Sequence, residues 1–215
     1  MWVKICGTTN LEDAQASVEA GADALGFVFA PSIRRISPKD AGKITANIAP
    51  VIEKFGVFVN QSPEIIFDTV RKAGLTGVQL QGDEEPGVAR KLKEIVPGLK
   101  VFKTIHMREA EIAEMDFKTM AAYDGLLFDS GTKENRGGTG VTFDWNSNAP
   151  MIRFLTRKFR VIIAGGLTPM NVGEALRLFT PAGVDVVSGV EREPGRKDYD
   201  KVRAFIASAK RAETD

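Results

Sequence analysis

The sequence predicts an α/β protein whose 215 residues form a single-domain (β/α)8 barrel, the TIM barrel. Short apolar runs alternate with amphipathic segments from one end of the chain to the other, and eight such units can be counted. Dividing the length by eight gives about 27 residues per unit, which suits a strand followed by its crossover helix. No stretch rich in Pro, Gly and Ser divides the chain, so residues 1–215 are expected to form one barrel.

Eight short runs rich in Val, Ile, Leu and Phe are the predicted strands. Most are continuous apolar runs, which is typical of parallel strands covered on both faces. An open doubly wound sheet is the second architecture considered; it usually has fewer strands, and no G-x-G-x-x-G follows the first strand. The strands are expected at Trp2–Ile5, Ala24–Phe29, Lys54–Phe58, Gly77–Leu80, Lys100–Thr104, Gly125–Phe128, Val161–Ala164 and Val184–Val187.

Capping residues mark the predicted helices between these strands. Ser, Asn or Asp precedes several of them, where a side-chain oxygen can accept from a free backbone N–H, and Pro often takes the first helical position. The helices are expected at Leu11–Ala20 after Asn10, from Pro38 after Ser37, at Pro63–Ala73 after Ser62, at Pro86–Val96, at Glu109–Met115, after Asp144 with Pro150 interrupting it, from Thr168 and Pro169 to Phe179, and at Tyr199–Ala209 after Asp198.

The composition excludes several classes of function. The 29 basic and 28 acidic side chains leave a net charge of +1, which gives no reason to expect nucleic acid or an anionic membrane surface as a partner. One histidine, His106, and one cysteine, Cys6, are too few for a zinc site, and no cofactor is expected. A single cysteine, no signal-peptide pattern and no apolar stretch near the roughly 20 residues of a membrane span favour a cytoplasmic protein.

Two chemically competent side chains follow predicted strands at the end where such barrels carry their active sites. Cys6 ends the first strand; a thiol has an ordinary pKa of about 8.5, so a modest decrease in that pKa gives a thiolate that can act as nucleophile or base. Asp129 ends the sixth strand and can donate a proton if it is partly desolvated. Each also has an ordinary explanation, a small buried hydrophobe for Cys6 and a loop cap for Asp129.

Glycine-rich loops after the seventh and eighth strands predict a phosphate site. Gly165 and Gly166 let the backbone come close to a ligand, and the helix expected from Thr168 offers free N–H groups and the positive end of its dipole. Ser188 and Gly189 follow the eighth strand, and barrels frequently bind phosphate with these two loops. We therefore expect a small phosphorylated molecule as the substrate.

Three further segments follow strands at the same end. Arg34 and Arg35 come after the second strand, where one guanidinium could hold a substrate carboxylate with two hydrogen bonds, although exposed arginine pairs are common. Gln81 ends the fourth strand. The segment Gly137–Gly140 is expected to form a flexible cover over Asp129 that excludes water.

Several short motifs run in a fixed order from Lys4 to about Asp198, over nearly the whole chain. They are Lys4–Gly7, Gly21–Phe27, Val78–Leu80, Leu127–Asp129, Gly137–Gly140 with Phe143–Trp145, Ala164–Leu167, and Gly183–Asp185 with Ser188–Glu191. Each motif alone is common, whereas the ordered set is specific. It resembles the phosphoribosylanthranilate isomerases of tryptophan biosynthesis.

This resemblance implies an Amadori rearrangement of N-(5-phosphoribosyl)anthranilate to 1-(2-carboxyphenylamino)-1-deoxyribulose 5-phosphate. It implies Asp129 as the general acid that opens the ribose ring, and Cys6 as the general base that removes the proton from C2. Arg34, in preference to Arg35, is implied for the anthranilate carboxylate, and Asp185 for a further substrate contact.

The chain departs from the family pattern at two positions. Gln81 stands where the family usually has histidine, so it is expected to bind substrate but not to transfer a proton. Val187 stands where the family usually has serine, which removes one hydroxyl near the phosphate and concerns affinity rather than chemistry.

Three other functions each fit part of this pattern. A bifunctional histidine and tryptophan isomerase would be expected to carry aspartate in place of Cys6, and a metal-dependent sugar-phosphate epimerase needs more His and Asp ligands. The remaining alternative is a non-catalytic barrel that binds a sugar phosphate, which would lack the acid or the base. The sequence leaves open whether the protein is a monomer or a homodimer.

Overall fold

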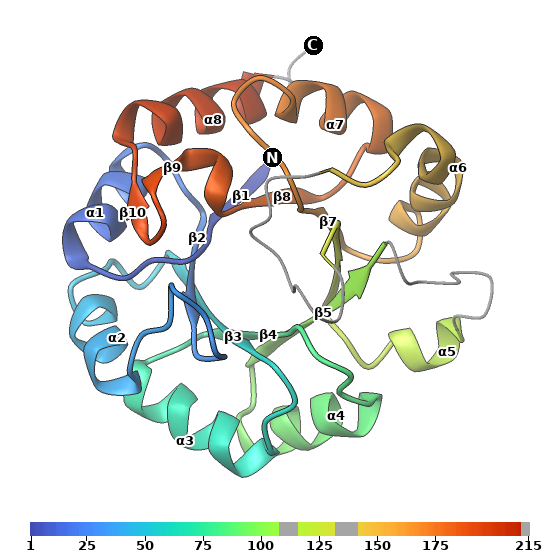
Figure 1. Ribbon diagram of the computed structural model, residues 1–215. Helices are drawn as coiled ribbons and strands as arrows, with labels where there is room; N and C mark the ends of the chain where they lie inside the picture. Colours follow the sequence, from blue (N-terminus) through green and yellow to red (C-terminus); the bar gives the residue numbers. More distant parts are fainter. Residues whose placement is uncertain (108–115, 132–141, 212–215) are drawn as a thin grey trace.

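The computed structural model describes residues 1–107, 116–131 and 142–211. Within these ranges eight parallel strands close into a barrel in the order β1 to β8, and helices form a ring outside them (Figure 1). The predicted (β/α)8 barrel is confirmed. The open doubly wound sheet is wrong, because β1 pairs with β8 and leaves the barrel without a free edge.

The elements follow the predicted alternation of strands and helices. The strands are β1 (Trp2–Ile5), β2 (Ala24–Val28), β3 (Glu53–Phe58), β4 (Gly77–Leu80), β5 (Lys100–His106), β6 (Gly125–Asp129), β7 (Val161–Ile163) and β8 (Gly183–Val186). The helices are α1 (Leu11–Glu19), α2 (Pro38–Thr45), α3 (Pro63–Ala73), α4 (Pro86–Ile95), α5 (Phe117–Met120), α6 (Trp145–Thr156), α7 (Val172–Phe179) and α8 (Tyr199–Arg211).

Most helix starts are fixed by the capping side chains that the sequence predicts. Asn10, Ser37, Ser62 and Asp144 each accept a hydrogen bond from a backbone N–H three residues later, which satisfies one of the free donors of the first turn. Asp198 does the same for α8, because its Oδ1 accepts from the N–H groups two and three residues later at 3.1 Å. These caps confirm the predicted starts of five helices.

The start of α7 was predicted wrongly. Thr168 and Pro169 do not open the helix, which begins at Val172. Instead, the backbone N–H of Thr168 donates to Oδ1 of Asn171 at 2.8 Å and forms a turn before the helix. The helix predicted at Glu109–Met115 lies outside the described residues, and α5 follows at Phe117–Met120.

A short hairpin between β8 and α8 was not predicted. A 3₁₀ turn, η2 (Ser188–Val190), leads into β9 (Glu191–Glu193), which pairs with β10 (Arg196–Lys197) in an antiparallel ladder. Although it lies near the C-terminal end of the chain, this hairpin packs beside α1 (Figure 1).

The interior of the barrel has an apolar layer and a polar layer. Trp2, Phe55 and Phe102 fill the end where the strands begin, with ring centroids 4.7 to 6.0 Å apart. Two residues farther along β1 and β4, Lys4 and Gln79 point inward, and Nζ of Lys4 donates to Oε1 of Gln79. A second and larger apolar core lies between the barrel and the helices. Among the described helices, none is both long and apolar enough to cross a membrane.

Candidate active site

Cys6 follows directly after β1 and is held tightly. Its side chain is buried, and its backbone N–H donates to the carbonyl of Val186 in β8 at 2.9 Å. Gly26 of β2 faces it so closely that a Cβ there would lie 2.4 Å from the sulfur. A larger residue at position 26 would therefore displace the thiol, so the pair of Cys6 and Gly26 fixes where the sulfur lies.

A chain of buried polar side chains connects the strand ends across the barrel. Lys4 pairs with Asp185 at 2.8 Å and donates to Oε1 of Gln79 at 2.9 Å. Gln79 in turn donates to Gln81, and Nε2 of Gln81 donates to Oδ2 of Asp129 at 3.4 Å. The network thus joins the two candidate carboxylates, Asp129 on β6 and Asp185 on β8, through neutral amides and one ammonium group.

Burial dominates the electrostatics of this network. It raises the pKa of Asp185, and the Lys4 ammonium opposes the rise while the charge of Asp129 adds to it. Burial alone would lower the pKa of Lys4, but the charges of Asp185 and Cys6 outweigh that effect and raise it. Lys4 therefore stays charged to a higher pH than an ordinary lysine, and the carboxyl of Asp185 loses its proton at a higher pH than an ordinary aspartate.

The pKa of Cys6 does not fall as the sequence led us to expect. Burial raises it, and the nearby ammonium groups of Lys4 and Lys197 reduce the rise without reversing it. The position of Cys6 at the end of a strand does not reveal the loss of water around the thiol. Once ionised, the thiolate of Cys6 is thus a stronger base than the thiolate of an exposed cysteine.

One small pocket brings the candidate acid and the predicted phosphate loops together. It is lined by Asp129 and Asp185 and by both loops, the latter with Gly165, Gly166, Ser188 and Gly189 among their residues. The grouping is the one expected from strand ends alone.

Glycine is required in these loops because they pack against neighbouring backbone. Gly165 and Gly166 have φ of 79° and 67°, and a Cβ on Gly165 would lie 2.4 Å from the backbone nitrogen of Ser130. A Cβ on Gly189 would lie 1.9 Å from the carbonyl oxygen of Leu167 in the other loop. The two loops therefore support each other.

The source of the N–H donors differs from the prediction. Since α7 begins only at Val172, its N-terminus does not follow Gly166 directly. Asn171 bridges the gap, with its Nδ2 donating to the carbonyl of Gly166 at 3.0 Å. Among the described residues, the N–H groups of Gly166 and Ser188 have no protein acceptor and remain available to an anion.

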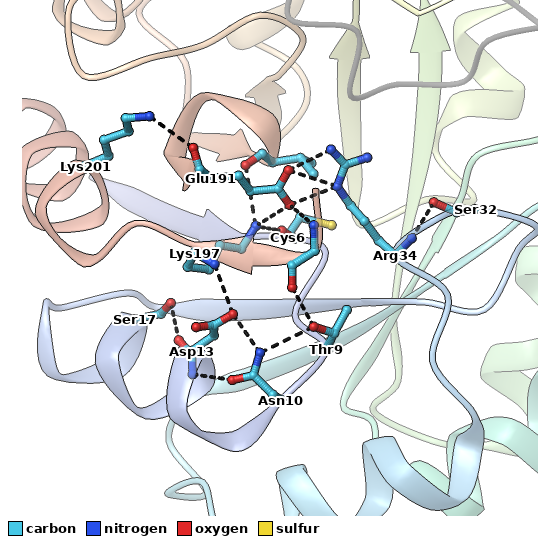
Figure 2. Close-up of polar contacts among 12 residues, drawn as sticks. Cys6, Thr9, Asn10, Asp13, Ser17, Ser32, Arg34, Glu191, Lys197 and Lys201 are labelled. Carbon is cyan, nitrogen blue, oxygen red and sulfur yellow. Dashed lines mark hydrogen bonds and ion pairs between the residues drawn. The ribbon is translucent and has the colours of Figure 1, made fainter. Parts of the chain in front are cut away.

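Arg34 already holds an internal carboxylate. Its Nε and Nη2 donate to both oxygens of Glu191, at 2.8 and 2.7 Å, and the remaining nitrogen points away from Glu191 (Figure 2). The hydrogen bonds to Glu191 raise the pKa of Arg34. Arg35 lies apart from this pair, in the groove beside Phe29 and Pro38. Only the outer edge of the Arg34 guanidinium is left for a second carboxylate.

Sequence reasoning missed four polar residues near the site. Lys4, Gln79 and His106 sit at inward positions of apolar strands, and a lone polar residue in such a run is the signal that could have identified them. Nε2 of His106 lies 2.9 Å from the carbonyl oxygen of Gln81, and His106 pairs in register with Asp129. Lys197 comes from the unpredicted hairpin and gave no such signal.

Two features remain, the predicted cover over Asp129 and side chains that could hold a metal ion. The segment Gly137–Gly140, expected as a cover over Asp129, lies outside the described residues. In the described ranges, no group of three His, Cys, Asp or Glu side chains is placed to hold a metal ion.

Comparison with known proteins identifies the family. A model of the family described as N-(5'phosphoribosyl)anthranilate (PRA) isomerase matches residues 3–208. This chain belongs to that family. The N-(5'-phosphoribosyl)anthranilate isomerase of Trichlorobacter lovleyi is 45% identical over 213 residues, which cover 98% of each chain.

Solved structures of family members share the whole fold. The phosphoribosyl anthranilate isomerase of Thermotoga maritima is 42% identical with a TM-score of 0.84, and the match covers 98% of both chains. A second structure, 40% identical with a TM-score of 0.81 and the same coverage, holds reduced 1-(o-carboxyphenylamino)-1-deoxyribulose 5-phosphate. The family predicted from the ordered motifs is therefore confirmed.

Proposed function

We propose that this protein isomerises N-(5-phosphoribosyl)anthranilate to 1-(2-carboxyphenylamino)-1-deoxyribulose 5-phosphate, a step of tryptophan biosynthesis. The observation that carries this proposal is the family match over residues 3–208 together with one pocket that contains Asp129, Asp185 and both glycine loops. A family member of the same fold holds a reduced form of the product, which is a phosphorylated small molecule.

The reaction needs one acid and one base. Asp129 protonates the ribose ring oxygen, and the bond from that oxygen to C1 breaks as the anilino nitrogen supplies electrons and becomes an iminium. The Cys6 thiolate then removes the proton from C2, and the electrons of that C–H bond neutralise the iminium to give an enolamine. The enolamine tautomerises to the ketone, so the substrate and product are isomers that differ in the opened bond between the ring oxygen and C1 and in the positions of hydrogen atoms. Each proton-transfer group is expected to contribute about 10²–10⁴-fold.

The other site residues bind the substrate in this proposal. The free edge of Arg34 holds the anthranilate carboxylate, while Asp185 and Gln81 contact the sugar. The N–H groups of Gly165, Gly166, Ser188 and Gly189 hold the phosphate. Gln81 has no proton to exchange at neutral pH, and its hydrogen bond to Asp129 suits it to orienting the acid.

A fluorescence assay tests this function directly. Freshly prepared N-(5-phosphoribosyl)anthranilate has anthranilate-type emission, which we expect to fall on adding the protein, and Cys6→Ser serves as the inactive control. A substrate that binds, as judged by quenching at equilibrium, but is never converted would instead support the alternative, a non-catalytic sugar-phosphate-binding barrel. Emission that stays constant without binding would reject both.

The domain organisation, location, partners and oligomeric state of the protein are proposed on the same grounds. We expect residues 1–215 to act as one barrel in the cytoplasm, without nucleic acid or membrane as partners, as a monomer or a homodimer. Fractionation of cells and light scattering of the purified protein test these expectations.

A further inference from the structure

Lys197 delivers a buried ammonium group to the strand ends beside Cys6. It lies at the end of β10 and is 1% exposed. Its Nζ donates to the carbonyl of Cys6 at 2.6 Å, to the carbonyl of Val187 at 3.4 Å and to Oε1 of Glu191 at 3.2 Å (Figure 2). A single side chain thus ties the ends of β1 and β8 to the hairpin.

The contacts of Lys197 require its charged form. All three partners are oxygen acceptors, and an ammonium group has three N–H donors, whereas a neutral amine has only two. Burial lowers the pKa of Lys197, and the charges of Glu191 and Cys6 oppose that decrease. The ammonium of Lys197 therefore places a positive charge 2.6 Å from the carbonyl oxygen of Cys6, the residue that carries the thiol.

The hairpin that carries Lys197 is itself firmly attached. The backbone N–H of Lys197 donates to Oδ2 of Asp13 in α1 at 3.0 Å. Nearby, the hydroxyl of Thr9 donates to the carbonyl of Gly195 at 2.6 Å, and the N–H of Gly195 donates to Glu191 at 3.3 Å. With both ends fixed, the ammonium of Lys197 has little freedom to move away from Cys6.

Fold stability does not account for a charge at this place. The backbone of Cys6 is already held through its N–H by the carbonyl of Val186, and removing an ammonium from water is unfavourable unless its partners compensate for the loss. Buried charges of this kind are concentrated at functional sites.

We propose that Lys197 is a positioning residue for Cys6: its ammonium holds the backbone of Cys6 and places a fixed positive charge beside the thiol. The inference rests on the proposed function, in which Cys6 is the base. Glu191 is part of the same arrangement, because it accepts hydrogen bonds from both Lys197 and Arg34. It therefore keeps Cys6, the candidate base, and Arg34, the candidate carboxylate site, in one cluster.

Four charged groups act on the thiol of Cys6, and Lys197 is one of three that favour its ionisation. Lys4 on β1 and Lys197 on β10 lower its pKa, whereas Asp185 on β8 raises it. Arg34, from the loop after β2, is close enough for the thiolate to raise the pKa of Arg34. Gly26, the neighbour on β2, contributes no charge. Lys4 is paired with Asp185 and Lys197 with Glu191, so loss of Lys197 removes one cation that favours the thiolate and leaves Glu191 paired with Arg34 alone.

The test compares four variants that separate charge from packing. Lys197→Met removes the charge and its hydrogen bonds, Lys197→Gln removes the charge but keeps donors, and Lys197→Arg keeps the charge. Lys201→Met is the matched control, since Nζ of Lys201 also holds this hairpin, through the carbonyl of Glu191 at 3.0 Å, but from the solvent side.

The first measurement is the ionisation of Cys6 itself. It is the only cysteine, so the ultraviolet absorbance of its thiolate can be titrated against pH after subtraction of the Cys6→Ser variant. We expect Lys197→Met and Lys197→Gln to ionise at higher pH than the wild type, and Lys197→Arg and Lys201→Met to match it. An increase of one unit in the pKa of Cys6 would lower the thiolate fraction at neutral pH, and with it kcat/KM, about tenfold.

The second measurement is the pH dependence of kcat/KM. If Lys197 acts on Cys6, raising the pH should restore much of the activity of the uncharged variants, whereas a packing defect would lower activity equally at all pH values. An unchanged Cys6 titration in folded Lys197→Met or Lys197→Gln overturns the proposal, and circular dichroism shows which variants are folded. If the wild type fails to convert the substrate, the proposed function is lost, but the titration still decides the role of Lys197.

Discussion

At the scale of single residues, the site pairs a thiol that resists ionisation with a carboxyl that is hydrogen-bonded by an amide. The positions of Cys6 and Asp129 at the ends of strands could both be predicted, and their roles as base and acid stay predictions. Lys4 could have been found as a lone polar residue in an apolar strand, whereas Lys197 could not, since its contacts with the ends of β1 and β8 leave no pattern in the sequence. The upward direction of the Cys6 pKa likewise depends on burial, which strand position alone does not reveal.

Cys6→Ser should abolish most of the isomerisation while leaving the fold intact. Serine is no larger than cysteine, so it fits against Gly26, but its hydroxyl is a far weaker acid and provides almost no conjugate base near neutral pH. We expect kcat to fall by at least about 10²-fold. Turnover close to that of the wild type, measured by substrate fluorescence in a folded variant, would remove Cys6 from the mechanism.

The pH profile of the wild type should reflect the raised pKa of Cys6. The base must be deprotonated to act, and burial moves that ionisation above the ordinary value for cysteine. Activity limited by the base should therefore keep rising with pH into the alkaline range and be lost as pH falls. A plateau of kcat/KM that already begins in the acidic range would show that another group supplies the base.

Asp129→Asn should remove the acid but little of the binding. The amide keeps the size of the side chain and can still accept from the N–H of Gly131, which bonds to Oδ1 at 3.0 Å in the wild type. It has no acidic proton, so kcat should fall by at least about 10²-fold with KM nearly unchanged, and the limb of the pH profile that reports the proton donor should disappear. An unaltered pH profile of kcat in this variant would mean that a different acid operates.

At the scale of elements, periodicity and capping predicted most of the barrel, and failures occur where tertiary contacts override local signals. Ser62–Pro63 and Thr168–Pro169 carry the same helix-start pattern, yet only the first begins a helix. After β7 the side chain of Asn171 instead bonds to both Thr168 and Gly166 and so holds the loop that we propose binds the phosphate. The β9–β10 hairpin was missed because it is short, polar and stabilised by α1 rather than by its own sequence.

Asn171→Ala should weaken the phosphate loop without touching the chemistry. It removes two hydrogen bonds that hold the loop, at 2.8 and 3.0 Å, and the loop must then be ordered by the ligand. A cost of about 0.5–1.5 kcal/mol corresponds to a KM increase of roughly two- to tenfold, with kcat little changed. Asn148→Ala is the control, because Asn148 also bonds to a backbone carbonyl but on the exposed face of α6. Equal KM values for the two variants would contradict the role given to Asn171.

At the scale of the whole molecule, the barrel separates stability from chemistry along its axis. The proposed site occupies the ends of the strands, while the opposite end is closed by Trp2, Phe55 and Phe102. Glycines make room for these rings: a Cβ on Gly77 would lie 2.5 Å from the ring of Phe55, and one on Gly125 would lie 2.8 Å from that of Phe102. The aromatic plug thus depends on small residues in neighbouring strands.

Gly125→Ala tests this separation. The added methyl group would meet three ring atoms of Phe102 within 3.2 Å, and Phe102 is fully buried, so the ring cannot move without disturbing its neighbours. Overpacking of this kind typically lowers the free energy of unfolding by about 1–3 kcal/mol. Gly87→Ala in α4 is the matched control, because nothing lies within 4 Å of a Cβ there and alanine favours a helix. Urea unfolding should therefore show a loss for the first variant and none for the second, while kcat/KM under native conditions stays at the wild-type value in both. A fall in kcat/KM for folded Gly125→Ala would show that packing at the base of the barrel is transmitted to the site, and that the two ends are not independent.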